Sequence, residues 1–227
     1  MSRHPKSPTM NSILSRLKRS IPTRECKKRF LIVCEDSRSA PNYFRALSKY
    51  LKIAASIEVC PSTLGTDPVN VVQSAIDIRE KIEEESNADP FDSVWAVFDA
   101  DLHSQNKHQI PNARQLADSN TIKLAISNPC FEYWLILHFE SCGETELQSD
   151  RMISKLSTLW IKYAKKKYEK GKADFSHVVK KCDEARKRAE QGRRQAAGRS
   201  PEEQNPCSEI DLLIDEIQKS IDGFKGK

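Results

Sequence analysis

The chain has little glycine and lacks the glycine motifs that cradle phosphates. It contains only 7 glycines in 227 residues, and none of them forms GxGxxG or GxxxxGK[ST]. Both motifs need glycine because the backbone must approach a phosphate closely. The serine-nucleophile motif GxSxG is also missing. These absences disfavour dinucleotide binding, P-loop chemistry and hydrolysis by a serine elbow, and they leave a nucleotide-binding sensor as a weak hypothesis.

Long apolar runs and regular cysteine spacings are missing too. No run reaches the roughly 18 apolar residues of a membrane helix, and residues 1–23 carry no apolar segment typical of a secretory signal. The seven cysteines are scattered, and no pair forms CxxC, so the sequence indicates neither a zinc site nor a disulfide framework. We expect a cytoplasmic protein without a membrane partner, with mostly buried cysteines and a disordered basic leader over residues 1–23.

Segments typical of strands alternate with segments typical of helices. Short apolar runs predict buried strands, and residues recurring at helical spacing predict helices between them. The expected strands are 30–35, 56–60, 92–99 and 121–127, and the expected helices are 41–52, 67–85, 112–118 and 130–140. This alternation is typical of right-handed βαβ crossovers. The sequence therefore predicts an α/β domain over residues 24–140, with a compact, mainly parallel sheet flanked by helices.

The remaining residues, 141–227, form a basic region with a helical pattern. Between Arg151 and Arg199 the sequence contains sixteen Lys or Arg and five Asp or Glu, a local excess of 16 − 5 = 11 positive charges. SPEEQNP predicts a loop, and an amphipathic helix capped by Ser208 is expected to pack back on the core. Its apolar stripe comprises Ile210, Leu213, Ile214 and Ile217.

The run KYAKKKYEKGK within this region places tyrosines among lysines. That mixture suits phosphate contacts combined with base stacking, although a charge run is more often just a solvated face. The predicted nucleic-acid-binding residues are Lys162, Lys165, Lys166, Lys167 and Lys170.

Acidic residues follow two of the expected strands. Glu35 comes directly after LIVC, and Asp99 and Asp101 come after WAVF. Ligands of an open parallel sheet bind beyond the carboxyl ends of its strands, so three carboxylates are expected to converge there. Two acids so close together repel each other unless a cation lies between them, and carboxylate oxygens suit Mg²⁺ or Mn²⁺. The alternative is that these acids are helix caps or solvated loop residues.

Four further residues have a second interpretation. His103 follows DxD and is either a ligand of the metal or scissile phosphate, or a solvated loop histidine. Asn128 and Glu132 follow the fourth strand and face the same edge of the sheet. Glu132 is either a fourth acid of the site or a favourable charge near a helix N-terminus. His138 lies on an apolar helix and is expected to be a core histidine.

Two sets of motifs resemble known families. FLIVCE with a distant FDAD resembles the Toprim pattern, which has a Glu after the first strand and DxD after the third. A longer ordered set resembles the RloB-like family of bacterial and archaeal defence proteins. Its segments are FLIVCEDS, PNYF, GTDPVNVV, FDADLH, SNPCFEYWLILHFE and NPCSEIDLLIDEI. The resemblance implies a Toprim-like fold, a role in anti-phage (abortive infection) defence and an ATPase partner.

Two functional hypotheses follow from the residues and the resemblance together. The first is a Mg²⁺- or Mn²⁺-dependent nuclease acting on RNA or DNA, with tRNA conceivable by analogy. In it Glu35, Asp99 and Asp101 hold the metal, and Glu35 acts as general acid or base or holds a second metal. The second is a non-catalytic module that binds nucleic acid or a partner protein. The sequence CEDSRSA, where RloB-like chains usually read CEGE, favours this alternative. The oligomeric state stays open, a homo-oligomer included.

Overall fold

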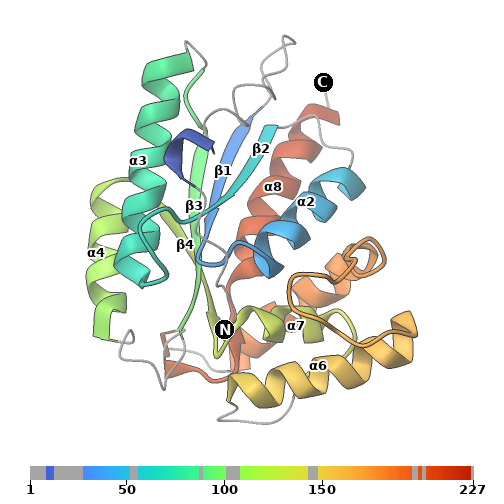
Figure 1. Cartoon of the computed structure of the whole chain (residues 1–227). Coiled ribbons are helices and arrows are strands. Elements are labelled where there is room, and N and C mark those ends of the chain that lie inside the picture. The colour runs from blue at the N-terminus through green and yellow to red at the C-terminus, as the bar shows by residue number, and fades with distance from the viewer. Residues whose placement is uncertain are drawn as a thin grey trace.

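A five-stranded sheet forms the centre of the molecule (Figure 1). The computed structural model describes residues 9–12, 28–51, 56–86, 89–100, 108–142, 148–195, 199–200 and 203–225. The strands run in the spatial order β2-β1-β3-β4-β5, and all neighbours are parallel except β5, which is antiparallel to β4. They are β1 (Arg29–Cys34), β2 (Ser56–Pro61), β3 (Ser93–Asp99), β4 (Lys123–Asn128) and β5 (Cys207–Ser208). The prediction of an α/β fold with a mainly parallel sheet is confirmed.

The three central strands end at one edge of the sheet. Cys34, the last residue of β1, pairs with Val97 of β3, and Asp99 pairs with Ser127 of β4. The chain moves outward from β1 to β2 and then returns to place β3 on the other side of β1. The boundary between β1 and β3 is therefore the topological switch point, where open parallel sheets bind ligands.

Helices cover both faces of the sheet. The side chains of β1 alternate, with Phe30 and Ile32 in one apolar cluster and Leu31 and Val33 in the other, and all four are buried. Burial on both faces explains why the strands read as continuous apolar runs. One face is covered by α3 (Pro68–Ser86) and α4 (Ile110–Ser119). The other face is covered by α2 (Ser39–Leu51), α5 (Phe131–Leu137), α7 (Cys182–Gln195) and α8 (Ile210–Lys225).

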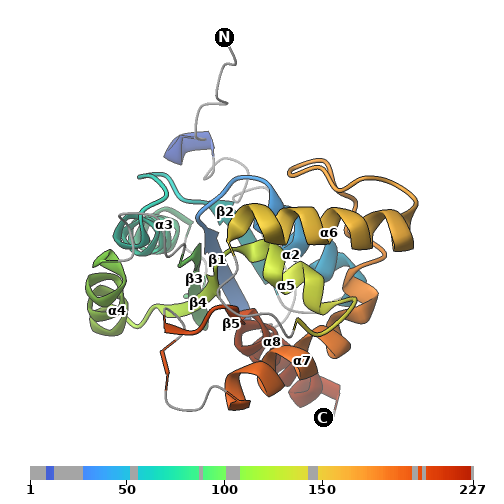
Figure 2. The same ribbon diagram turned by 90° about the horizontal axis from the view of Figure 1, so that it is seen from below.

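The view from below shows the edge at which the parallel strands end (Figure 2). There α6 (Ser149–Ala164) lies beside α5, and a segment containing the short 3-10 helix η3 (Val179–Lys181) connects α6 to α7. None of the helices within the described ranges is long and apolar enough to cross a bilayer.

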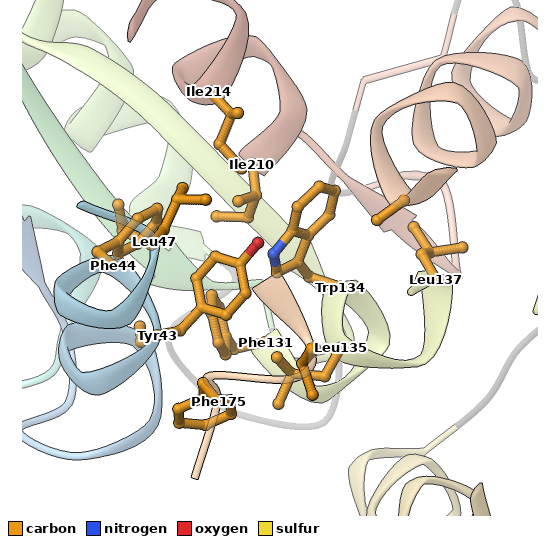
Figure 3. Packing of buried hydrophobic residues seen from close by; sticks show 14 of the residues in the cluster. Tyr43, Phe44, Leu47, Phe131, Trp134, Leu135, Leu137, Phe175, Ile210 and Ile214 are labelled. Carbon is orange, nitrogen blue, oxygen red and sulfur yellow. The ribbon is translucent and has the colours of Figure 1, made fainter. Parts of the chain in front are cut away.

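The larger apolar cluster is built around Tyr43 of α2 (Figure 3). Its ring lies 5.8 Å from that of Phe131, 6.1 Å from that of Trp134 and 5.9 Å from that of Phe175, each in an edge-to-face arrangement. Such pairs add to the stabilisation from burial. The aromatic residues after the fourth strand therefore attach α5 and the segment before α7 to α2.

The C-terminal helix packs into the same cluster, as predicted. The four residues of its apolar stripe are all buried, namely Ile210, Leu213, Ile214 and Ile217. The region 141–227 thus contributes α6, α7 and α8 to the core and β5 to the sheet. The expected leader, residues 1–23, lies outside the described residues except for 9–12.

The short strand β5 was not predicted. Residues 207–208 lie between the predicted loop and the predicted last helix, and they form a strand because their backbones pair with the end of β4. Ser208 still accepts a hydrogen bond from the Ile210 N–H at 3.3 Å, so it does serve the start of α8. Five of the six described cysteines are buried and all six are free thiols, as expected.

Candidate functional site

Glu35 and Asp99 meet at the switch point. The N–H of Glu35 donates to the carbonyl of Val97 at 2.8 Å, which extends the β1–β3 pairing by one residue. The N–H of Asp99 in turn donates to Glu35 Oε2 at 2.7 Å. Both side chains are half-buried. The structure therefore brings together two of the acidic residues that the sequence analysis assigned to one site.

Asp36 organises the turn that follows Glu35. Its carboxylate accepts hydrogen bonds from the backbone N–H of Ser39 at 3.0 Å and of Arg38 at 3.3 Å, at the start of α2. Among the residues that the structure describes, Thr121 and Lys165 are the non-glycine residues with positive φ, so this turn needs no left-handed residue. An Asp in place of the Gly of the CEGE pattern is therefore compatible with the placement of Glu35.

Asn128 and Glu132 lie at the same edge of the sheet. The N–H of Ala100 donates to the carbonyl of Ser127 at 2.8 Å, so β3 and β4 stay paired up to the site. Asn128 ends β4 and is fully buried, and Glu132 in the first turn of α5 is also fully buried. Both residues are therefore part of the walls of the site rather than of its exposed rim.

Glu132 has two partners from a distant part of the chain. The hydroxyl of Tyr168 donates to Glu132 Oε1 at 3.0 Å, and the ammonium of Lys170 lies 3.7 Å from the same oxygen. The other oxygen, Oε2, is buried and has no hydrogen-bond partner among the described residues. A buried carboxylate oxygen without a partner is costly, so this atom has unused capacity to bind a donor or a cation.

Negative charge is in excess at this site. Burial, followed by the neighbouring carboxylates of Glu35 and Glu132, raises the pKa of Asp99 well above its ordinary value, and Lys170 opposes this shift. Although partial burial lowers the pKa of Lys170, the carboxylates of Glu132, Asp99 and Asp36 raise it above its ordinary value overall. Several acids thus repel one another at this site, and a cation would relieve that repulsion.

Comparison with known proteins identifies the family. A model of the family described as RloB-like protein matches residues 30–217, which include every site residue described above. The chain belongs to the RloB-like family. No significant match was found among curated proteins or among solved structures.

The donor set of this RloB-like chain fits a hard divalent cation. The Glu35 carboxylate accepts from the Asp99 backbone, and the carboxylates of Glu35 and Glu132 act electrostatically on that of Asp99. Oxygen ligands are those that Mg²⁺ and Mn²⁺ prefer. Within the described ranges no three His, Cys, Asp or Glu side chains already stand in a metal-binding arrangement. Asp101 and His103, assigned to the site from sequence, lie outside the described residues. The metal site therefore remains a prediction.

The predicted nucleic-acid-binding lysines divide into two groups. Four of them are exposed around the end of α6, namely Lys162, Lys165, Lys166 and Lys167. Lys170 instead approaches Glu132, so it belongs to the acidic site.

The expectation of base stacking is wrong for Tyr168. This residue is only 4% exposed, and its hydroxyl bonds Glu132 and Ser39 Oγ, the latter at 3.2 Å. Its ring packs 5.3 Å from that of Trp160 in the core. Tyr163 is 45% exposed, but one side of its ring is stacked on Phe139 with centroids 4.8 Å apart. The sequence analysis missed the role of Tyr168 because a tyrosine between lysines resembles a surface residue.

Proposed function

We propose that this RloB-like protein is a metal-dependent nuclease that hydrolyses phosphodiester bonds of RNA or DNA in anti-phage defence. The observation that carries the proposal is the contact between Glu35 and Asp99 at the switch point, where the Asp99 N–H donates to the Glu35 carboxylate. Two acids that adjoin there, with a buried third acid beside them, form an arrangement suited to metal-assisted hydrolysis.

Four acids have roles in this proposal. Glu35 and Asp99, together with Asp101, would hold Mg²⁺ or Mn²⁺, and Glu35 would accept the proton of the attacking water. The bound metal would supply activation of that water and stabilisation of the charge that develops on the phosphate. Glu132 is fully buried and holds Tyr168 and Lys170 in place.

The exposed lysines at the end of α6 would contact the phosphates of the substrate. Lys162, Lys165, Lys166 and Lys167 are all solvent-exposed on the segment that leads to Lys170. Such contacts position a nucleic acid without reading its sequence. We further propose, from the resemblance that the sequence motifs carry, a defence role with an ATPase partner, and tRNA is one of the substrates to be tested.

A non-catalytic binding module is the second candidate function. The observation in its favour is Lys170, whose ammonium supplies positive charge to the acidic site without any metal. In that case the same surface would hold nucleic acid or a partner protein and leave it uncut.

Incubation of the purified protein with panels of RNA, tRNA and DNA, with and without Mg²⁺ or Mn²⁺, tests the proposal. We expect metal-dependent cleavage that falls about a hundredfold or more in Glu35→Gln, because Gln has the shape of Glu but cannot take a proton. Binding of the nucleic acid should stay nearly unchanged. Glu190→Gln, the same substitution at an exposed position of α7, is the matched control and should cleave like the native protein.

The metal site has a readout that does not depend on cleavage. Mn²⁺ should raise the melting temperature of the native protein, because binding to the folded state stabilises it by mass action. Asp99→Ala combined with Asp101→Ala should abolish that shift, and an equal shift in both proteins would exclude these ligands. The protein is also assayed together with its proposed ATPase partner. If it binds nucleic acid but cleaves none, either alone or with the ATPase, the result favours the binding module.

A further inference from the structure

Lys170 belongs to the connection between α6 and α7, yet its side chain reaches the acidic site at the edge of the sheet. Its ammonium lies 3.7 Å from Glu132 Oε1, which is completely buried. The lysine side chain itself is 45% exposed. One end of the contact is therefore in the protein interior, while the lysine side chain stays partly open to solvent.

Two neighbours in the chain hold Lys170 in this position. Tyr168 is buried and bonds both Glu132 and Ser39. Gly171 has φ of 85°, and a Cβ added to it would lie 2.7 Å from the Cδ of Arg38. Residues 168–171 are thus packed against the turn after β1, and a side chain at position 171 would disturb that packing.

The charges around Lys170 indicate what its ammonium can bind. Glu35, Glu132 and Asp36 all raise the pKa of Asp99, and Lys170 opposes them. A phosphate group is repelled by such a set unless cations lie between it and the acids. One divalent ion held by Glu35 and Asp99, together with the ammonium, would provide two positive contacts for one phosphate.

We propose that Lys170 is the second cation of the site, whose ammonium contacts a non-bridging oxygen of the scissile phosphate, and that the protein consequently binds one divalent ion. The inference rests on the proposed nuclease function. Many hydrolases place a second metal at this position. A lysine there stabilises the charge of the transition state and needs no further ligands.

In this reaction the oxygen of water forms a bond to phosphorus, and the bond from phosphorus to the leaving ester oxygen breaks. The proton of the water passes to Glu35, and the leaving oxygen takes a proton from solvent. Lys170 keeps all its protons throughout, because its role is to contact the phosphate.

Lys170→Met, compared with Lys172→Met, tests this inference. Lys172 lies on the same segment, but its side chain is 80% exposed and pairs with Glu169 at 2.8 Å. Binding of Mn²⁺ is measured by isothermal titration calorimetry. We expect one ion in the native protein and in Lys172→Met, and two in Lys170→Met, because the carboxylates that have lost their ammonium partner can then hold a second ion.

Kinetics supply the second readout. In Lys170→Met, kcat should fall about a hundredfold with a much smaller change in KM, because the contact strengthens as charge develops on the phosphate. Lys170→Arg, which keeps the charge, should recover part of the loss. A merely structural ion pair would instead lower the melting temperature and leave kcat of the folded protein unchanged.

The outcomes separate this inference from the proposed function. Two Mn²⁺ ions in the native protein, or the same number and affinity in native and Lys170→Met, would overturn the role of Lys170. A native protein that binds one Mn²⁺ but cleaves no nucleic acid would contradict the proposed nuclease function. The number of ions bound by Lys170→Met would still show whether Lys170 takes the place of a second cation. A native protein that binds no Mn²⁺ would overturn both.

Discussion

Glu132 has an unusual environment for a carboxylate. It is fully buried, and an ionised group in the interior loses several kcal/mol of solvation unless partners replace the water. Tyr168 and Lys170 replace that water at Oε1, whereas Oε2 has no hydrogen-bond partner within the described part of the chain. A residue with this cost is easier to explain as part of a binding site than as packing, since an apolar side chain would pack as well.

His138 is a core histidine, as predicted from its place on an apolar helix. It is 1% exposed, and its two ring nitrogens lie 3.0 Å from the carbonyl of Trp134 and 2.9 Å from the hydroxyl of Tyr43. Because a carbonyl only accepts, Nδ1 carries the proton and donates, and Nε2 accepts from the tyrosine. Burial lowers the pKa of His138 to about 3.

The first prediction concerns this histidine and the pH dependence of stability. Above pH 6.5 the imidazole is neutral in both states. Between pH 6.5 and about pH 3, His138 is protonated in the unfolded chain but stays neutral in the folded chain. The free energy of unfolding therefore falls as the pH falls from 6.5 to about 3. Between pH 6.5 and 5 the free energy of unfolding should fall in both proteins, and the fall should be smaller in His138→Gln by up to about 2 kcal/mol. Urea unfolding at a series of pH values measures this, and parallel profiles would contradict the assignment.

Among the helices, much of the positive charge of α7 attaches it to its neighbours. Arg193 pairs with Asp211 of α8, whose side chain is 3% exposed, and also donates to the carbonyl of Ser208 at 3.0 Å. Arg186 bonds Asp215 of α8, and Arg188 donates to the carbonyl of Leu137 at the end of α5. Part of the basic composition therefore serves packing between helices and leaves less of it for a ligand.

The second prediction tests this attachment. Arg193→Met should lower the free energy of unfolding by about 3 kcal/mol or more, because it leaves the Asp211 carboxylate buried without its cation. Arg194→Met is the matched control, since Arg194 pairs with Glu190 on the surface, with side chains 77% and 51% exposed. That pair should contribute less than about 0.5 kcal/mol. Similar losses in both variants would show that the buried pair has no special role.

Across the molecule as a whole, the exposed positive charge is unevenly placed. The chain carries a net charge of +5, although residues 151–199 hold sixteen basic and five acidic side chains. With α7 engaged in packing, the exposed lysines at the end of α6 are the main candidates for contact with a polyanion. They lie a few residues before Lys170, so a bound backbone could extend from them to the acidic site.

The third prediction follows from this distribution. Changing Lys165, Lys166 and Lys167 together to Gln should weaken nucleic-acid binding, because fewer phosphates are then neutralised by the protein. The slope of log affinity against log salt should become shallower by about 0.7 to 0.9 for each phosphate that no longer meets a lysine. Fluorescence anisotropy at several salt concentrations measures both quantities.

A matched triple variant controls for the change in net charge. Lys49, Lys187 and Lys219 are exposed on α2, α7 and α8, and their joint replacement by Gln also removes three positive charges. If the slope becomes shallower by the same amount in both triple variants, binding depends on overall charge rather than on the end of α6.

The parallel sheet and the meeting of Glu35 with Asp99 were predictable from the sequence. Both follow from local patterns, because apolar runs separated by helices predict parallel strands and parallel strands end at a common edge. The buried cysteines and the apolar stripe of the last helix follow in the same way from composition and period. The strand β5 did not, because a two-residue strand has no pattern of its own and exists only through pairing with β4.

Tertiary packing determines which residues of the basic region serve the acidic site. Tyr168 and Lys170 stand among lysines and have the local pattern of a solvated segment. They reach Glu132, more than thirty residues earlier in the chain, because the segment after α6 packs against the turn after β1. Periodicity and charge describe a residue's own element, whereas a contact between distant segments depends on how those elements pack together. For that reason the paired acids at the strand ends were predictable, while the tyrosine and the lysine beside them were not.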